Sequence, residues 1–145
     1  MSSYKSPSKQ PAQLRGLALQ ILNLFCLSLL LTKALNSLDA ALALPLNDIV
    51  RDAVIQRFEY TFELSWKTLK VASEYMGMEC RSPRETIKAG FKFTWIQSPD
   101  LWFEAMEARN KTSHTYDEDI AREVYEVAGK FSFLVKELIA KLGGL

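Results

Sequence analysis

Histidine and cysteine are scarce in this chain, which holds one histidine and two cysteines among 145 residues. A structural zinc site needs about four such ligands close together. Cys26 and Cys80 are distant and form no CxxC pair, so they also provide no disulfide framework. We therefore expect no metal or other cofactor, a buried reduced thiol at Cys26 within its apolar run, and a cytoplasmic protein.

A strong charge of one sign is also absent, because 18 basic and 17 acidic residues give a formal net charge of +1. A dedicated duplex-binding protein normally has a larger basic excess, so any contact with nucleic acid should be made by a small local patch. The hydrophobic fraction of 48% and the charged fraction of 24% are those of a soluble globular protein. A chain of this length fits one domain.

The N-terminal region combines a polar segment with an apolar one. Residues 1–14 are rich in serine, lysine and proline, which predicts a flexible tail before a single helical domain at 15–145. The apolar run Leu17–Leu31 after basic residues imitates a signal peptide, so export is the alternative. Polar residues interrupt the run, its spacing continues to Leu44, and it is shorter than the ~20 apolar residues that span a bilayer. We expect a buried first helix and no membrane contact.

A second helix is predicted after Pro45, with Asn47 as its N-cap, Asp48 in its first turn and Gly77 as its stop. Its apolar residues recur at spacings of three and four, which places them on one stripe that faces the core. They are Val54, Phe58, Phe62, Trp66 and Leu69.

Two shorter helices follow, each opened by a serine cap and a proline. Ser82-Pro83 with Glu85 predicts a third helix that ends near Phe93. Ser98-Pro99 repeats the pattern and opens a fourth helix. Arg109 falls in the last turn of that helix, where the helix dipole favours a cation.

The capping box Thr115-Tyr-Asp-Glu118 predicts the start of a last helix. His114 would then lie just before a helix N-terminus. The apolar face of this helix is Ile120, Val124, Val127, Phe131, Leu134 and Leu138. Because no strand-like alternation occurs in the sequence, the predicted fold is all-α, an up-and-down bundle of four to five helices.

The stretch Arg109-Asn-Lys-Thr-Ser-His114-Thr-Tyr116 predicts a site that handles phosphate. Histidine exchanges a proton readily near neutral pH, and arginine is a permanent planar cation that fits phosphate oxygens. A short turn between two helices would let Arg109 and His114 converge. The plain structural alternatives are a histidine that caps a helix and an arginine that only interacts favourably with the helix dipole.

Other charged residues have weaker claims to a site. Glu59 and Glu63 have the spacing of a di-iron bundle, but the partner Glu-x-x-His pattern is absent, so we reject that interpretation. Five basic residues are solvated surface or form the local basic patch expected above. They are Arg81, Arg84, Lys88, Lys92 and Lys111.

Several segments, taken in order, resemble the HepT-like branch of the HEPN superfamily, also called nucleotidyltransferase substrate-binding proteins. The resemblance spans roughly residues 33–140, while residues 1–32 are more apolar than the charged first helix of that family. The matching segments are Lys33-Ala-Leu with Leu38-Asp-Ala-Ala-Leu, Val54–Leu69, Ser82–Lys88 and Arg109–Asp117.

The resemblance implies a four-helix-bundle homodimer that works beside an MNT-type nucleotidyltransferase in a toxin–antitoxin pair. It implies a metal-independent ribonuclease with Arg109 and His114 as the catalytic pair. Tyr116 resembles the tyrosine that the partner enzyme modifies with AMP to silence the toxin. The residues that could contact RNA or phosphate are Arg84, Asn110, Lys111 and Ser113.

The residue types suit attack of an RNA 2′-hydroxyl on its own phosphate, with His114 moving the proton and Arg109 stabilising the charge. One histidine per chain suggests that two copies share a site across a two-fold axis. A different function is a non-catalytic subunit that presents a substrate to the nucleotidyltransferase, in which these residues only hold a phosphate. A third is a structural partner that dimerises and docks.

Overall fold

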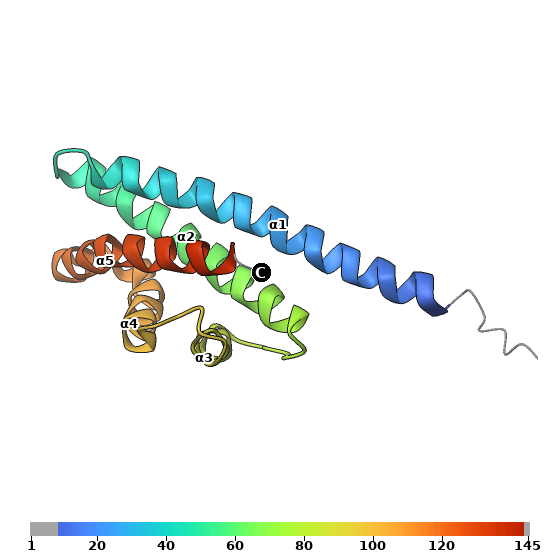
Figure 1. The fold of residues 1–145 in the computed structure, drawn as a ribbon. Coiled ribbons are helices and arrows are strands. Elements are labelled where there is room, and N and C mark those ends of the chain that lie inside the picture. Colours follow the sequence, from blue (N-terminus) through green and yellow to red (C-terminus); the bar gives the residue numbers. More distant parts are fainter. Residues whose placement is uncertain (1–8, 144–145) are drawn as a thin grey trace, which may run out of the picture.

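The computed structural model describes residues 9–143, which form five α-helices and one short 3-10 helix (Figure 1). The described residues contain no strand, so the predicted all-α fold is confirmed. The elements are α1 (Lys9–Leu42), α2 (Asp48–Tyr75), α3 (Pro83–Lys92), α4 (Pro99–Asn110), η1 (Thr112–His114) and α5 (Glu118–Leu142).

Helix α2 is the centre of the bundle, because it contacts α1, α3, α4 and α5. It follows α1 in a helical hairpin, and α5 packs on both (Figure 1). Arg57 of α2 fastens this hairpin, since its Nη1 donates to the carbonyl oxygen of Ser37 in α1 at 2.6 Å. The short α3 packs against α2 and α4 and completes the fold.

Three predicted helix starts are confirmed. The side chain of Asn47 accepts a hydrogen bond of 2.8 Å from the backbone three residues later, at the start of α2. Ser82 does the same for α3 at 3.2 Å. Helix α4 begins at Pro99 as predicted, but Ser98 makes no side-chain capping bond. There, the fixed φ of proline favours the first turn without a cap.

The predicted cap of α5 is wrong by two residues. Asp117, not Thr115, is the N-cap, and its carboxylate accepts from two backbone N–H groups of the first turn at 2.9 and 3.3 Å. The reason is η1, which continues the chain as a tight turn through His114. In that turn the Thr115 hydroxyl donates backwards to the carbonyl of Thr112 at 3.2 Å.

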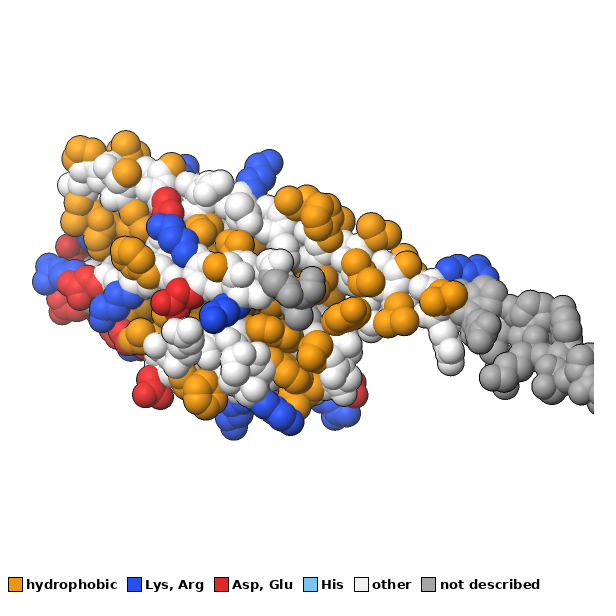
Figure 2. All heavy atoms as spheres, in the orientation of Figure 1, with side chains coloured by type: hydrophobic (Ala, Val, Ile, Leu, Met, Phe, Trp, Pro, Cys, Tyr) orange, Lys and Arg blue, Asp and Glu red, His pale blue; other side chains and the backbone are white. Residues whose placement is uncertain are grey.

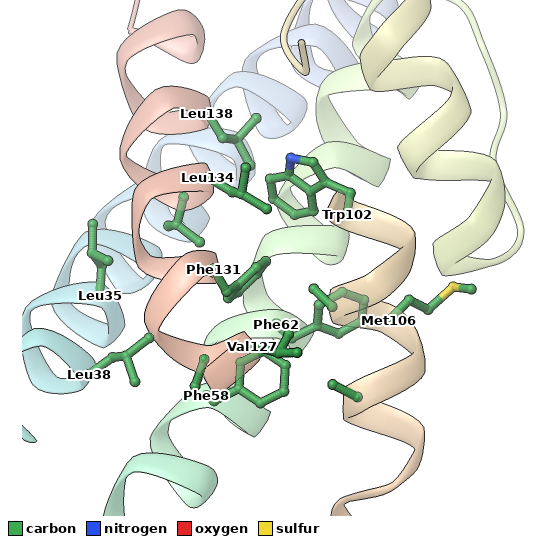
Figure 3. Packing of buried hydrophobic residues seen from close by; sticks show 14 of the residues in the cluster. Leu35, Leu38, Phe58, Phe62, Trp102, Met106, Val127, Phe131, Leu134 and Leu138 are labelled. Atoms are coloured by element: carbon green, nitrogen blue, oxygen red, sulfur yellow. The ribbon is translucent and has the colours of Figure 1, made fainter. Parts of the chain in front are cut away.

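The core is built around Phe131 of α5, which is fully buried. Its ring centroid lies 5.3 Å from that of Phe58, 5.7 Å from Phe62 and 5.2 Å from Trp102 (Figure 3). These rings come from α5, α2 and α4, so one residue joins three helices. The predicted stripes of α2 and α5 thus face the core, although Trp66 is only half-buried.

Helix α1 differs from its prediction at both of its N-terminal features. It begins at Lys9, so residues 9–14 of the expected tail are helical, and residues 1–8 lie outside the described part of the chain. The expected buried helix is buried only from Leu31 onward, and Cys26 is exposed instead of buried. Figure 1 shows the reason: α2 diverges from α1 toward α3, so α1 extends past the bundle by itself.

Candidate functional site

The three main predicted site residues lie at or beside the turn between α4 and α5, where His114 contacts Tyr116 and Arg109 contacts Thr112. Arg109 lies in the last turn of α4, as predicted, and His114 is the last residue of η1. Tyr116 follows in the turn before α5 and is 84% exposed. His114 is also exposed, so both rings are open to solvent and to a large ligand.

His114 and Tyr116 contact each other directly. The Tyr116 hydroxyl lies 3.5 Å from Nδ1 of His114, and the two rings meet edge to face with centroids 6.0 Å apart. At that distance the hydrogen bond is weak. The geometry nevertheless places any group attached to the tyrosine hydroxyl beside the imidazole.

Arg109 is held by carboxylates of α2. Its Nη2 lies 3.5 Å from Oε1 of Glu59, and its Nε lies 3.2 Å from Oε1 of Glu63. The buried Nε makes no hydrogen bond, so its attraction to Glu63 is mainly one of charge. Nη1 donates to the Thr112 hydroxyl at 3.3 Å. The guanidinium therefore has a defined orientation before any ligand binds.

Glu63 is the more firmly fixed of the two carboxylates. Its other oxygen accepts a hydrogen bond of 3.0 Å from Nε1 of Trp66 on the same helix. Glu59 is more exposed than Glu63, with 43% against 34% of its side chain accessible. The spacing of Glu59 and Glu63 is thus explained by an arginine that faces both.

Sequence reasoning missed Glu59, Glu63 and Thr112 as parts of this site. The available signal was a pair of glutamates four residues apart, which places them on one face of the second predicted helix. Their partner lies some fifty positions away along the chain, so only the fold reveals the contact.

A solvent-open groove of about 370 Å³ lies beside Tyr116, between α2 and the turn. Carboxylate, amide and hydroxyl groups dominate its walls, which suits a polar ligand more than an apolar one. The groove is lined by Asp52, Ile55, Gln56, Glu59, Thr112, Thr115 and Tyr116. The described residues offer no cluster of three or more histidine, cysteine, aspartate or glutamate side chains for a metal ion.

Three of the four residues predicted to contact RNA lie on the same turn. Asn110 and Ser113 are exposed there. Lys111 is half-buried, and its Nζ pairs with Glu123 of α5 at 2.9 Å. A ligand at the turn would therefore meet two exposed polar side chains and one lysine that already has a partner.

Arg84 lies elsewhere. It pairs with Glu107 of α4 at 3.9 Å, and its guanidinium lies 5.1 Å from the centre of the Phe103 ring. Glu107 and Arg109 are about 200° apart around α4. The structure therefore brings Asn110, Lys111 and Ser113 together with the site, but not Arg84.

Comparison with known proteins gives one family. The family model described as "Nucleotidyltransferase substrate binding protein like" matches residues 29–143. A curated protein of Haemophilus influenzae named "Probable ribonuclease HepT" is 30% identical over 103 residues, which cover 62% of this chain and 70% of that protein.

Two solved structures share the fold. A crystal structure of a Thermus thermophilus protein has a TM-score of 0.73 and 32% identity, covering 77% of this chain and 98% of the other. A Haemophilus influenzae structure, described as the fold of a substrate binding domain of a nucleotidyltransferase, has a TM-score of 0.71 and 24% identity. That likeness covers 79% of this chain and 98% of the other and concerns the fold.

Proposed function

This chain belongs to the nucleotidyltransferase substrate binding protein like family, and from that premise we propose that it is a metal-independent endoribonuclease. It acts as the toxin of a toxin–antitoxin pair, in the cytoplasm, with an MNT-type nucleotidyltransferase as antitoxin. The name of the Haemophilus influenzae relative supports the reaction class. The observation that carries the proposal is the exposed turn that joins a fixed arginine, the single histidine and a tyrosine.

The proposed reaction is internal transfer of an RNA phosphate. The 2′-hydroxyl oxygen attacks phosphorus, the bond from phosphorus to the 5′-oxygen breaks, and the products are a 2′,3′-cyclic phosphate and a 5′-hydroxyl end. Neutral His114 accepts the proton of the 2′-hydroxyl. Arg109 stabilises the negative charge that grows on the non-bridging oxygens.

The leaving 5′-oxygen needs a proton from a second donor. Each chain has one histidine, so the proposal assigns this step to the protonated His114 of a second copy. An isologous homodimer would bring two turns together across a two-fold axis. Activity should then require the dimer, and an interface variant that is monomeric yet cleaves RNA at the normal rate would contradict this assignment.

Silencing follows from the position of Tyr116. Transfer of AMP to its hydroxyl, with release of pyrophosphate from ATP by the nucleotidyltransferase, would attach a bulky anion to the oxygen that lies 3.5 Å from Nδ1 of His114. The anion would block the approach of RNA to the imidazole. It would also compete with RNA phosphate for Arg109.

The proposal is tested by incubating the unmodified full chain with total tRNA and mRNA in the presence of a chelator. We expect cleavage with cyclic phosphate ends, a rate that changes with pH, and complete loss of cleavage in His114→Ala. Tyr125→Phe, on α5 and outside the turn, is a control variant that should cleave normally. Absence of cleavage by an unmodified dimer would overturn the proposal.

A non-catalytic substrate-binding subunit is the second candidate. The family description and the polar groove beside Tyr116 favour it. It differs in one measurable respect, because RNA or nucleotide binding should then largely survive His114→Ala and no cyclic ends should form.

A further inference from the structure

The projecting part of α1 exposes a large apolar surface. Eight large apolar side chains between residues 14 and 30 are 47% to 66% exposed. Figure 2 shows hydrophobic side chains along the visible face of the arm that leaves the bundle. Soluble proteins rarely expose so large a patch without a function. The residues are Leu14, Leu17, Leu19, Ile21, Leu22, Phe25, Leu29 and Leu30.

These side chains cover more than half of the circumference of the helix and do not form one narrow stripe. At about 100° per residue, Leu17, Leu29 and Leu30 point in directions roughly 100° to 140° apart. A single partner helix covers only one stripe, and a helix that lies flat on a membrane needs a polar face. An apolar surface this wide is typical of a helix that is inserted into an apolar medium.

The length of the segment fits the same medium. Residues 14–30 extend about 25 Å, near the lower end of the 17 to 25 residues that cross a hydrocarbon layer. The helix over Ala12–Leu42 is long and apolar enough to cross a membrane, and little of its most apolar part is buried against the rest of the chain. Basic residues precede the segment in the sequence and would complement anionic lipid headgroups.

Most of the segment also lies outside the family match, which begins at residue 29. Residues 14–28 are therefore not part of what this chain shares with the family model. The candidate site lies beside the first half of α2, at the end of the bundle far from the projecting arm (Figure 1). Binding at the arm would therefore leave the candidate site exposed to water.

We propose that residues 14–30 of α1 insert into the hydrocarbon layer of a lipid bilayer and tether the helical domain to a membrane surface. This replaces the expectation, drawn from the sequence, that the chain makes no membrane contact. The inference does not depend on the ribonuclease proposal, since it rests on the exposed arm and not on the turn.

The test uses the full chain, purified in mild detergent and diluted into vesicles of phosphatidylcholine and phosphatidylglycerol. We expect it to float with the vesicles, and Leu22→Lys/Phe25→Lys to float at least about tenfold less. Both positions are exposed, so the fold should persist, which circular dichroism checks. The matched control Ile49→Lys/Phe133→Lys changes exposed apolar residues of the domain and should float like the parent chain.

Cys26 gives a second readout within the arm. It is exposed, whereas Cys80 is buried and burial raises the pKa of the Cys80 thiol, so a maleimide dye at neutral pH should label Cys26 selectively. Vesicles should shift the emission of an environment-sensitive dye to shorter wavelength.

Three results would overturn the inference. The chain could stay in the aqueous phase with the vesicles present. The emission of the dye on Cys26 could shift to shorter wavelength without lipid as the protein concentration rises. That result would show that a second copy of the chain covers the apolar surface of the arm. Mass spectrometry of the chain recovered from cells could also show that the arm has been removed.

Discussion

At Arg109 a single cation faces two carboxylates, and this ratio determines what the arginine can do. The unliganded cluster carries a net negative charge, which repels a phosphate. An ion pair that is open to solvent contributes little to stability, so an incoming phosphate can replace a partly exposed carboxylate more readily than a buried one. The longer, more exposed contact to Glu59 is the one to yield, while Glu63 stays fixed by Trp66.

The two glutamates should therefore have opposite effects when neutralised. If RNA cleavage proceeds as proposed, Glu59→Gln should lower KM roughly two- to fivefold, because the phosphate no longer competes with a carboxylate. Glu63→Gln should lower kcat about tenfold or more, because Arg109 loses its fixed orientation. Glu63→Asp should restore part of the rate.

Steady-state cleavage of a short RNA measures both parameters. Glu137→Gln, at an exposed position on α5, is the matched control for loss of one negative charge. Equal effects of all three neutral variants would show that only net charge matters and that neither glutamate positions Arg109.

Tyr116 should be needed for silencing but not for cleavage. Tyr116→Phe removes the hydroxyl that would accept AMP and keeps the ring against His114. We expect it to cleave RNA within about threefold of the parent rate and to remain active when the nucleotidyltransferase and ATP are added. Intact mass spectrometry should show one AMP on the parent chain and on the control Tyr75→Phe, but none on Tyr116→Phe.

At the scale of elements, α2 and α3 end with the same backbone motif but different residues. In α2, Gly77 has φ of 87°, and the N–H of Met78 bonds to Ser73 O at 2.8 Å. In α3, Thr94 has φ of 65°, and the N–H of Trp95 bonds to Gly90 O at 2.9 Å. Only glycine adopts this left-handed conformation without strain, so Thr94 costs about 1 to 2 kcal/mol.

Thr94→Gly should therefore stabilise the protein. We expect the free energy of unfolding to rise by up to about 1 kcal/mol. The gain is smaller than the strain relieved, because glycine has more conformational entropy to lose when the chain folds. Gly77→Ala is the complementary change and should destabilise by about 1 kcal/mol. Urea denaturation followed by circular dichroism measures both. A loss of stability in Thr94→Gly would mean that the threonine side chain contributes more than its backbone strain costs.

Local signals predicted most elements because they depend on neighbours in the sequence. Asn47 and Ser82 cap their helices through bonds to residues three positions later. Thr115 had an equally good local signal, but its hydroxyl bonds backwards to the carbonyl of Thr112 in η1 and does not cap α5. The burial of α1 was predicted wrongly because it depends on the path of α2, and no nearby residue encodes that path.

At the scale of the whole molecule, one aromatic ring links three helices. Phe131→Ala should remove the contacts to Phe58, Phe62 and Trp102 and lower the free energy of unfolding by about 3 to 5 kcal/mol. Phe133→Ala, two positions away and 67% exposed, should change it by less than about 0.5 kcal/mol. Urea denaturation distinguishes the two, and a similar loss in both would show that Phe131 is not the centre of the core.

The candidate site also divides into residues that a local sequence motif identifies and residues that only the fold brings into contact. Arg109, His114 and Tyr116 were identifiable because a motif of fixed spacing holds them within one turn. Glu59, Glu63 and Thr112 were not, since the arginine reaches across to another helix. Arg84 seemed a plausible phosphate ligand by charge, but the packing of α3 directs it to the opposite side of α4.

Three consecutive residues of α2 face three different surroundings: Arg57 bonds to α1, Phe58 enters the core and Glu59 pairs with Arg109. Each is turned about 100° from the one before. A change of one side chain disturbs one of these surroundings. Inserting or deleting one residue upstream would rotate the helix beyond it by the same angle and exchange all three roles at once. The first half of α2 can therefore diverge in composition during evolution far more readily than in length.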